Sequence, residues 1–142
     1  MDYCRINLDK TNYELLPNTQ FKILTNWSYG ELNSIYMAYC KYKKFASVMP
    51  MFYEDFKNNE VVGYYHNNKL VAWSLIVLYP SQQSVMAEQF AWDYVNPELR
   101  LGIRSLEHEC AYYKQQGYHY MYLHGADEYK KDFDGFETLG SV

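Results

Sequence analysis

The stretch from Trp92 to His124 constrains the fold of this chain more than any other segment. Its pattern predicts the end of a strand, a short loop that holds Gly102, an amphipathic helix over about 103–116, a stop at Gly117, and a second strand over 118–123. A helix that connects two strands of one sheet in this way makes the strands parallel. The first N–H groups of such a helix have no acceptor within it, so a glycine beside them indicates an anion-binding site. The same glycine can also serve turn geometry alone.

Helical and strand periods alternate along the rest of the chain. Ser28 and Glu31 match a capping box, and apolar residues follow them at helical spacing. Asn67-Asn68 separates two apolar runs, as a tight hairpin turn does. In chain order, the sequence predicts short strands over 3–8 and 21–24, helices over 28–44 and 50–59, strands over 61–66, 70–79 and 85–92, the helix over 103–116 packed through Ile103, Leu106, Cys110 and Tyr113, the strand over 118–123, and a helical turn over 127–133. Short turns join the three strands over 61–92, so these strands form an antiparallel meander.

Residues 1–142 have the composition of a single globular domain. Apolar residues make up 49% of the chain and charged residues 21%, which suits a packed core rather than a disordered segment. The formal net charge of −4 argues against nucleic-acid binding through broad phosphate neutralisation. It therefore disfavours a single-strand nucleic-acid binder, although the 17 tyrosines could stack on bases.

The cysteines and histidines predict neither a disulfide framework nor a metal site. Cys4, Cys40 and Cys110 are odd in number and form no CxxC pair, so we expect buried free thiols. No cysteine or histidine lies at ligand spacing, and His108, between two glutamates on the predicted helix, is expected to be exposed. The sequence shows no apolar run of membrane-spanning length and no signal peptide, so we expect a cytoplasmic protein that does not bind membranes.

The helix entrance reads Arg100-Leu101-Gly102-Ile103-Arg104. Together with the order of elements, it resembles the GNAT (N-acetyltransferase-like) superfamily, whose motif there is Arg/Gln-x-x-Gly-x-Gly/Ala. The resemblance implies an α/β (α+β) fold of the acyl-CoA N-acyltransferase type, in which a mixed, mostly antiparallel sheet is flanked by helices. In that fold the two strands joined by the crossover helix splay apart. A typical acetyltransferase then adds two more strands, and we expect these C-terminal strands to be missing here.

The resemblance also implies where an acyl donor binds. The donor lies between the splayed strands with its phosphates on the helix N-terminus, which assigns residues 100–104 and Lys130 to the donor site. Gly102 matches the motif, whereas Arg104 replaces its second small residue and would either block a pyrophosphate or pair with a phosphate. Surface charge is the alternative reading of Arg100 and Arg104. No resident cofactor is expected, and the donor is either a coenzyme A thioester or an aminoacyl-tRNA.

A series of short matches between residues 69 and 137 indicates a narrower resemblance. The matches are Leu70-Val71-Ala72, Tyr79-Pro80, Ser84-Val85, Asp93, Pro97, Leu101-Gly102, Leu106, Glu109, Gly117-Tyr118, Tyr120, Tyr122-Leu123, Tyr129-Lys130 and Phe133. In order and spacing they resemble the C-terminal half of arginyl-tRNA–protein transferases and their bacterial leucyl-transferring relatives, which is itself a GNAT-like domain. The Tyr-Lys pair is also similar to peptidoglycan peptidyltransferases of the same superfamily. This narrower resemblance implies an aminoacyl-tRNA partner.

The resemblance implies two catalytic residues, Glu88 and Tyr129. Glu88 lies on the strand that borders the gap, where related enzymes often hold a general base for an amine, and a carboxylate in such a cleft can have a raised pKa. Tyr129 would protonate a leaving thiolate, and Lys130 would meet the tRNA terminus or a substrate carboxylate. The structural alternatives are a solvent-facing glutamate, a capping tyrosine and a solvated lysine.

Two classes of function therefore compete. The first is an acyl-group transferase, either an N-acyltransferase or an aminoacyltransferase, that acts on an amine of a small molecule or protein. The second is a non-catalytic GNAT-like module for protein interaction or dimerisation, with tyrosines at its interface. Missing terminal strands would leave a sheet edge for a second copy to cover, so we expect a homodimer.

Overall fold

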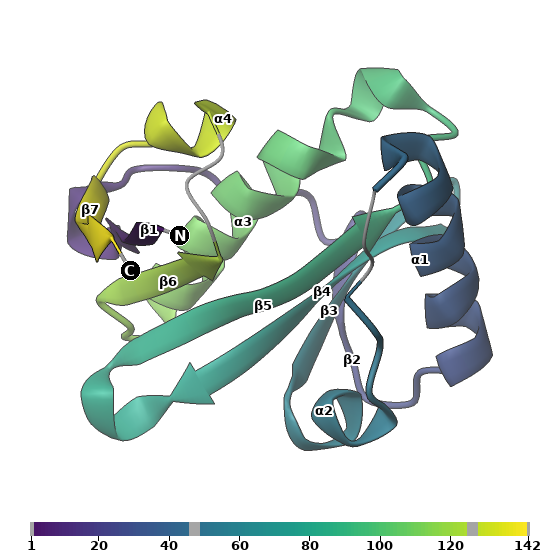
Figure 1. The fold of residues 1–142 in the computed structure, drawn as a ribbon, viewed down its shortest axis with the longest axis horizontal. Helices are drawn as coiled ribbons and strands as arrows, with labels where there is room; N and C mark the ends of the chain where they lie inside the picture. The colour runs from purple at the N-terminus through teal and green to yellow at the C-terminus, as the bar shows by residue number, and fades with distance from the viewer. Residues whose placement is uncertain (1, 46–48, 125–127, 142) are drawn as a thin grey trace.

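A seven-stranded sheet forms the centre of the molecule in the computed structural model, which describes residues 2–45, 49–124 and 128–141 (Figure 1). Its strand order is β2-β3-β4-β5-β6-β1-β7. The elements are β1 (Asp2–Asn7), β2 (Phe21–Leu24), α1 (Tyr29–Lys43), α2 (Tyr53–Asn58), β3 (Glu60–His66), β4 (Lys69–Tyr79), β5 (Ser84–Trp92), α3 (Leu101–Gln115), β6 (Tyr120–His124), α4 (Glu128–Lys131) and β7 (Phe136–Ser141), with short 3-10 helices at Leu8–Lys10, Pro80–Gln82 and Pro97–Leu99. Within these ranges, no helix combines the length and apolar character that a membrane span requires.

Each face of the sheet buries its own apolar cluster. On one face α1 packs its helical stripe against the sheet, and the Trp73 indole donates a hydrogen bond of 2.9 Å to the Leu32 carbonyl. Ser28 caps α1 by accepting a hydrogen bond from the Glu31 N–H at 3.3 Å. On the other face the larger cluster packs against α3, whose Leu106, Cys110 and Tyr113 are buried, whereas Ile103 is half-buried.

The predicted crossover is confirmed. β5 and β6 pair in parallel, from Ser84 opposite Tyr120 to Ala87 opposite Leu123. The helix α3 connects them and ends at Gln115, and the predicted stop, Gly117, follows two residues later with a φ of +96°. The antiparallel meander of β3, β4 and β5 is confirmed as well.

A β-bulge at Glu88 marks the point where the sheet opens. Leu75 pairs with Gln89 and Ile76 pairs with Ala87, so Glu88 is left without a partner on β4. The last β5–β6 pair is Ala87 with Leu123, and β5 then continues to Trp92 without β6 beside it. The bulge therefore lies where the two parallel strands separate. Figure 1 shows β5 running on past the end of β6.

The structure corrects part of the expectation that two C-terminal strands are missing, because one strand follows β6 within the described residues. β7 is present and pairs antiparallel with β1, which itself pairs antiparallel with β6. Gly135 has a φ of +75°, and a side chain there would collide with the Asn7 carbonyl, so glycine lets the chain turn back against β1. β7 therefore covers the edge of β1 within the chain itself, and a homodimer stays a prediction.

His108 is buried rather than exposed, which corrects a second expectation. Only 1% of it is exposed, and its Nδ1 accepts a hydrogen bond of 3.0 Å from the Leu16 N–H. The Phe21 ring lies 4.1 Å from the His108 ring, centroid to centroid. The segment before β2 thus covers the side of α3 that carries His108. The glutamates on either side of His108 had suggested that this side faces solvent.

Candidate functional site

Two adjoining cavities lie where β5 and β6 separate. The inner cavity has a volume of about 320 Å³ and is bounded by α1, β5, α3, β6 and α4. The outer cavity has a volume of about 590 Å³ and extends toward the start of α3 and the end of α1. Both are lined by Tyr39, Phe45, Phe90, Gly102 and Tyr129, so they form the two ends of one cleft.

A buried carboxylate, that of Glu109, lines the inner cavity from α3. Glu109 is 3% exposed, and its Oε2 accepts hydrogen bonds from the Ser74 hydroxyl at 2.6 Å and from the Tyr64 hydroxyl. Its Oε1 has no hydrogen-bond partner among the described residues. The fully buried side-chain atoms that lack a partner in the described part of the chain are those of Gln89, Trp92 and His108, so Oε1 is not fully buried. Oε1 is therefore accessible from the cavity. Burial raises the pKa of Glu109 from 4.5 to about 7, against the lowering effect of the two hydrogen bonds.

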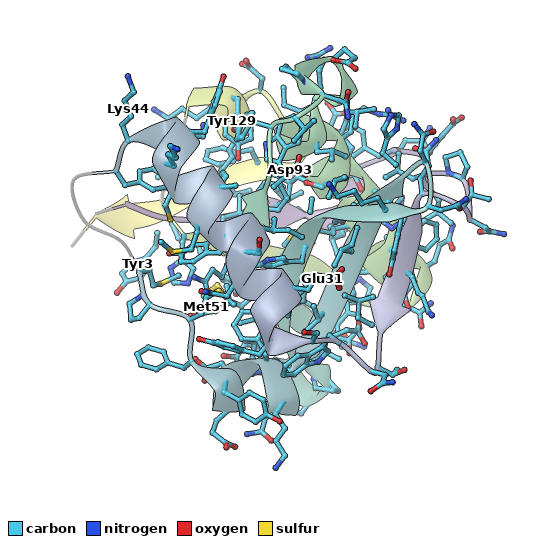
Figure 2. The ribbon with its side chains drawn as sticks, turned by 90° about the vertical axis from the view of Figure 1, so that its right-hand side faces the viewer. Tyr3, Glu31, Lys44, Met51, Asp93 and Tyr129 are labelled. Carbon is cyan, nitrogen blue, oxygen red and sulfur yellow. The ribbon has the colours of Figure 1, made fainter. Side chains whose placement is uncertain are left out.

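The predicted catalytic residues come together around the inner cavity. Glu88 Oε2 lies 3.0 Å from His124 Nε2, and both side chains line this cavity. Lys130 also lines it and donates a hydrogen bond of 3.3 Å from Nζ to the His124 carbonyl. Tyr129 lines both cavities, and Figure 2 labels it in the view from the side of α1. The Glu88 side chain is 34% exposed, so it faces the cleft without being closed off from water.

Gly102 lies in the first turn of α3 rather than in the loop before it. The helix begins at Leu101 because Arg100 adopts a left-handed conformation, with a φ of +50°, and caps the helix through its backbone. Gly102 itself has no positive φ, and a Cβ built on it would meet nothing within 4 Å. Neither turn geometry nor packing therefore requires a glycine at this position, which lines both cavities.

The other residues of the predicted donor site fall into two groups. Arg100 and Ile103 line the outer cavity. Leu101 is 6% exposed and packs in the core, and Arg104 is half-buried and lines neither cavity. Two residues correspond to about 200° around a helix, so Arg104 and Gly102 point in nearly opposite directions. This arrangement gives no support to the alternative in which Arg104 blocks the site.

The two ends of the cleft differ in charge. The outer cavity is lined by Lys43 and Arg100 and by no carboxylate from the described residues. The inner cavity is lined by the carboxylates of Glu88 and Glu109, with His124 and Lys130 at the same end. The outer end therefore favours an anionic group and the inner end can accommodate a cationic one.

Glu109 is a lining residue of clear chemical interest that the sequence did not assign to the site, as are His124 and Lys43. It entered only as one match among those between residues 69 and 137. Glu109 lies three residues after Leu106 and four before Tyr113, so helical spacing already places it on the predicted buried stripe. An ionisable residue on a buried helix face is the signal that would have identified it.

Comparison with known proteins supports the fold. No protein family model and no curated protein sequence matches this chain. Among solved structures, L-PGS from Bacillus licheniformis matches with a TM-score of 0.66 and 14% identity, over 88% of this chain and 46% of that one. A GNAT-family protein from Novosphingobium aromaticivorans matches with a TM-score of 0.65 and 14% identity, over 98% of this chain and 60% of that one.

A smaller protein matches over most of its length. An aminoglycoside acetyltransferase from an uncultured soil metagenomic sample has a TM-score of 0.54 and 16% identity, over 80% of this chain and 82% of that one. This chain thus spans only about half of L-PGS, and slightly more of the Novosphingobium protein. Similarity at these identities establishes architecture, and this chain adopts the GNAT (N-acetyltransferase-like) fold.

Proposed function

We propose that this chain transfers an acyl group to an amine in the cleft between β5 and β6. One observation carries the proposal: the cleft joins a basic end at the start of α3 to an end that holds two carboxylates. A donor with an anionic group and an acceptor with a basic nitrogen would meet between these ends. The acetyltransferase among the structural neighbours supports the same class of reaction.

The outer cavity is the proposed donor site. The first N–H groups of α3 have no acceptor within the helix and suit a phosphate. Lys43 and Arg100 line the same cavity and add positive charge. The absence of a side chain at Gly102 lets a donor approach the helix backbone closely. A coenzyme A thioester is the first donor to test, because the acidic chain and small cleft favour a small donor over an aminoacyl-tRNA.

The proposed chemistry requires one base and one acid. Glu88 accepts a proton from the acceptor amine, directly or through a water, so that the neutral nitrogen can attack the acyl carbonyl. A bond forms between nitrogen and the carbonyl carbon, and the bond from that carbon to the leaving group breaks. Tyr129, which lines both cavities, donates a proton to the leaving thiolate, and the second proton of the nitrogen returns to Tyr129 through water as the amide forms.

A donor and acceptor screen tests the proposal. Purified protein is incubated with acetyl-coenzyme A and a panel of primary amines, while thiol release and the mass of each amine are followed. We expect thiol release that depends on the amine, together with an acetylated amine of matching mass. A second series replaces acetyl-coenzyme A with aminoacyl-tRNA. If neither donor supports transfer to any amine, the non-catalytic module becomes the better account of this chain.

Replacing Gly102 with alanine should weaken coenzyme A binding by about 10- to 100-fold, the scale of one lost charged hydrogen bond. The added methyl group enters the cleft where the donor approaches the helix. The fold should tolerate it, because the position is open, and alanine should raise the free energy of unfolding by about 0.5–1 kcal/mol. Calorimetric titration with coenzyme A and thermal unfolding measure the two effects.

Gly30 provides a matched control for this substitution. It is the second residue of α1, as Gly102 is of α3, and it lines neither cavity. A Cβ on Gly30 would meet only the Ser28 hydroxyl, at 3.8 Å. Gly30→Ala should therefore leave coenzyme A binding unchanged. Equal binding by wild type and Gly102→Ala would show that the donor does not approach α3 at Gly102.

A further inference from the structure

The buried carboxylate of Glu109 has no assigned role in the chemistry proposed above. We infer that the inner cavity binds an alkylammonium group and that Glu109 is the carboxylate that recognises it. The inference rests on the proposed function for the fate of the bound amine. Ammonium binding itself can be measured without any acyl donor.

The geometry around Glu109 leaves one carboxylate oxygen for a ligand. Ser74 and Tyr64 donate to Oε2 from β4 and β3, and they hold this oxygen in place. Oε1 has no partner among the described residues and keeps access to the cavity. A carboxylate that is 3% exposed is costly to ionise unless a cation or further donors compensate it. An ammonium group in the cavity would supply both the charge and the donors.

The walls of the inner cavity suit an alkylammonium rather than a metal ion. Tyr36 and Tyr39 of α1 and Phe90 of β5 line it, and aromatic rings favour nearby cations as well as alkyl chains. The Tyr36 hydroxyl donates to the Met49 carbonyl, so Tyr36 offers mainly its ring. Lys130 also lines the inner cavity and donates to the His124 carbonyl. Glu109 has no salt-bridge partner among the described residues.

Two kinds of substrate carry such a group. An acceptor amine arrives as an ammonium and loses its proton to Glu88 before it attacks. An aminoacyl donor carries an α-ammonium beside the carbonyl that reacts. Both kinds of substrate share the positive charge and the N–H groups that the site recognises. We therefore use n-butylammonium as the probe for an acceptor amine and L-alaninamide as the probe for an aminoacyl donor.

The test is a ligand titration followed by amide chemical shifts at about pH 7.5, where both amine probes are mainly protonated, at constant ionic strength. Wild-type protein is titrated with n-butylammonium, L-alaninamide and the neutral isostere 1-butanol. We expect at least one ammonium probe to bind about tenfold more tightly than 1-butanol and to shift residues of the inner cavity. The probe with the larger preference identifies the source. In Glu109→Gln, which keeps both hydrogen-bond acceptor roles, the preference should fall to about one.

Glu60→Gln is the matched control. Glu60 also accepts a hydrogen bond from a tyrosine hydroxyl, that of Tyr113 at 2.7 Å, but it does not line the inner cavity. This variant should keep the ammonium preference of the wild type. Equal binding of charged and neutral probes by wild type, no binding of either ammonium, or an unchanged preference in Glu109→Gln would each overturn the inference. A protein that binds ammonium through Glu109 but transfers no acyl group would overturn the proposed function alone.

Discussion

Replacing Glu88 with glutamine should lower the turnover number for acyl transfer by about 10²- to 10⁴-fold, the usual effect of removing a general base. Glutamine has almost the same size and can still contact His124, but it cannot accept the proton of the amine. The KM for the amine should change little, since Glu109 rather than Glu88 is the proposed recognition group. Steady-state kinetics with a saturating donor separate the two parameters.

Asp9→Asn is a control that removes the same kind of contact elsewhere. Asp9 lies 2.9 Å from the Nδ1 atom of His119, which comes just before β6. Glu88 makes the same kind of contact with His124, the last residue of β6. Neither Asp9 nor His119 lines the cleft. Asp9→Asn should therefore keep the wild-type turnover number. A Glu88→Gln enzyme with a normal turnover number, or an equal loss in both variants, would exclude Glu88 as the base.

The crossover was predictable because its signals are local. The apolar period of α3, the stop at Gly117 and the apolar strand after it lie within one continuous stretch. Strand pairing between the two ends of the chain has no such local signal. β7 is short and includes Glu137 and Gly140, so its sequence does not stand out as a strand, and only the pairing with β1 places it.

The site was predictable in outline and not in depth. Resemblance placed Glu88, Gly102 and Tyr129 on elements that border one gap, and the structure shows all three lining the cleft. The bulge that sets Glu88 at the branch point arises from pairing with β4, which no local pattern encodes. The burial of Glu109 likewise depends on Tyr64 and Ser74, which are distant in sequence, although the helical spacing of Glu109 was visible.

The stability of the protein should carry a pH-dependent contribution from Glu109. Its pKa is raised by burial from 4.5 to about 7, so the folded protein holds the proton more tightly than the unfolded chain does. The resulting stabilisation is fully present below about pH 4.5 and is lost as the pH rises through about 7. Each pKa unit corresponds to about 1.4 kcal/mol, so the loss should amount to roughly 3 kcal/mol. Glutamine at position 109 cannot ionise and should escape this loss.

Glu109→Gln should therefore gain stability relative to wild type by roughly 3 kcal/mol between pH 4.5 and pH 8. Chemical denaturation across this range measures the free energy of unfolding of both proteins. Subtracting one value from the other cancels the contribution of groups that titrate in both proteins. Tyr64, Cys110 and Tyr113, whose pKa values Glu109 helps to raise, keep their protons throughout the range, and Glu88, which lines the same cavity, is present in both proteins. Ser105→Ala, on the same face of α3, should differ from wild type by the same amount at every pH. A pH-independent difference for Glu109→Gln would show that the carboxylate is already compensated in the free protein, and that no cation is needed to stabilise its charge.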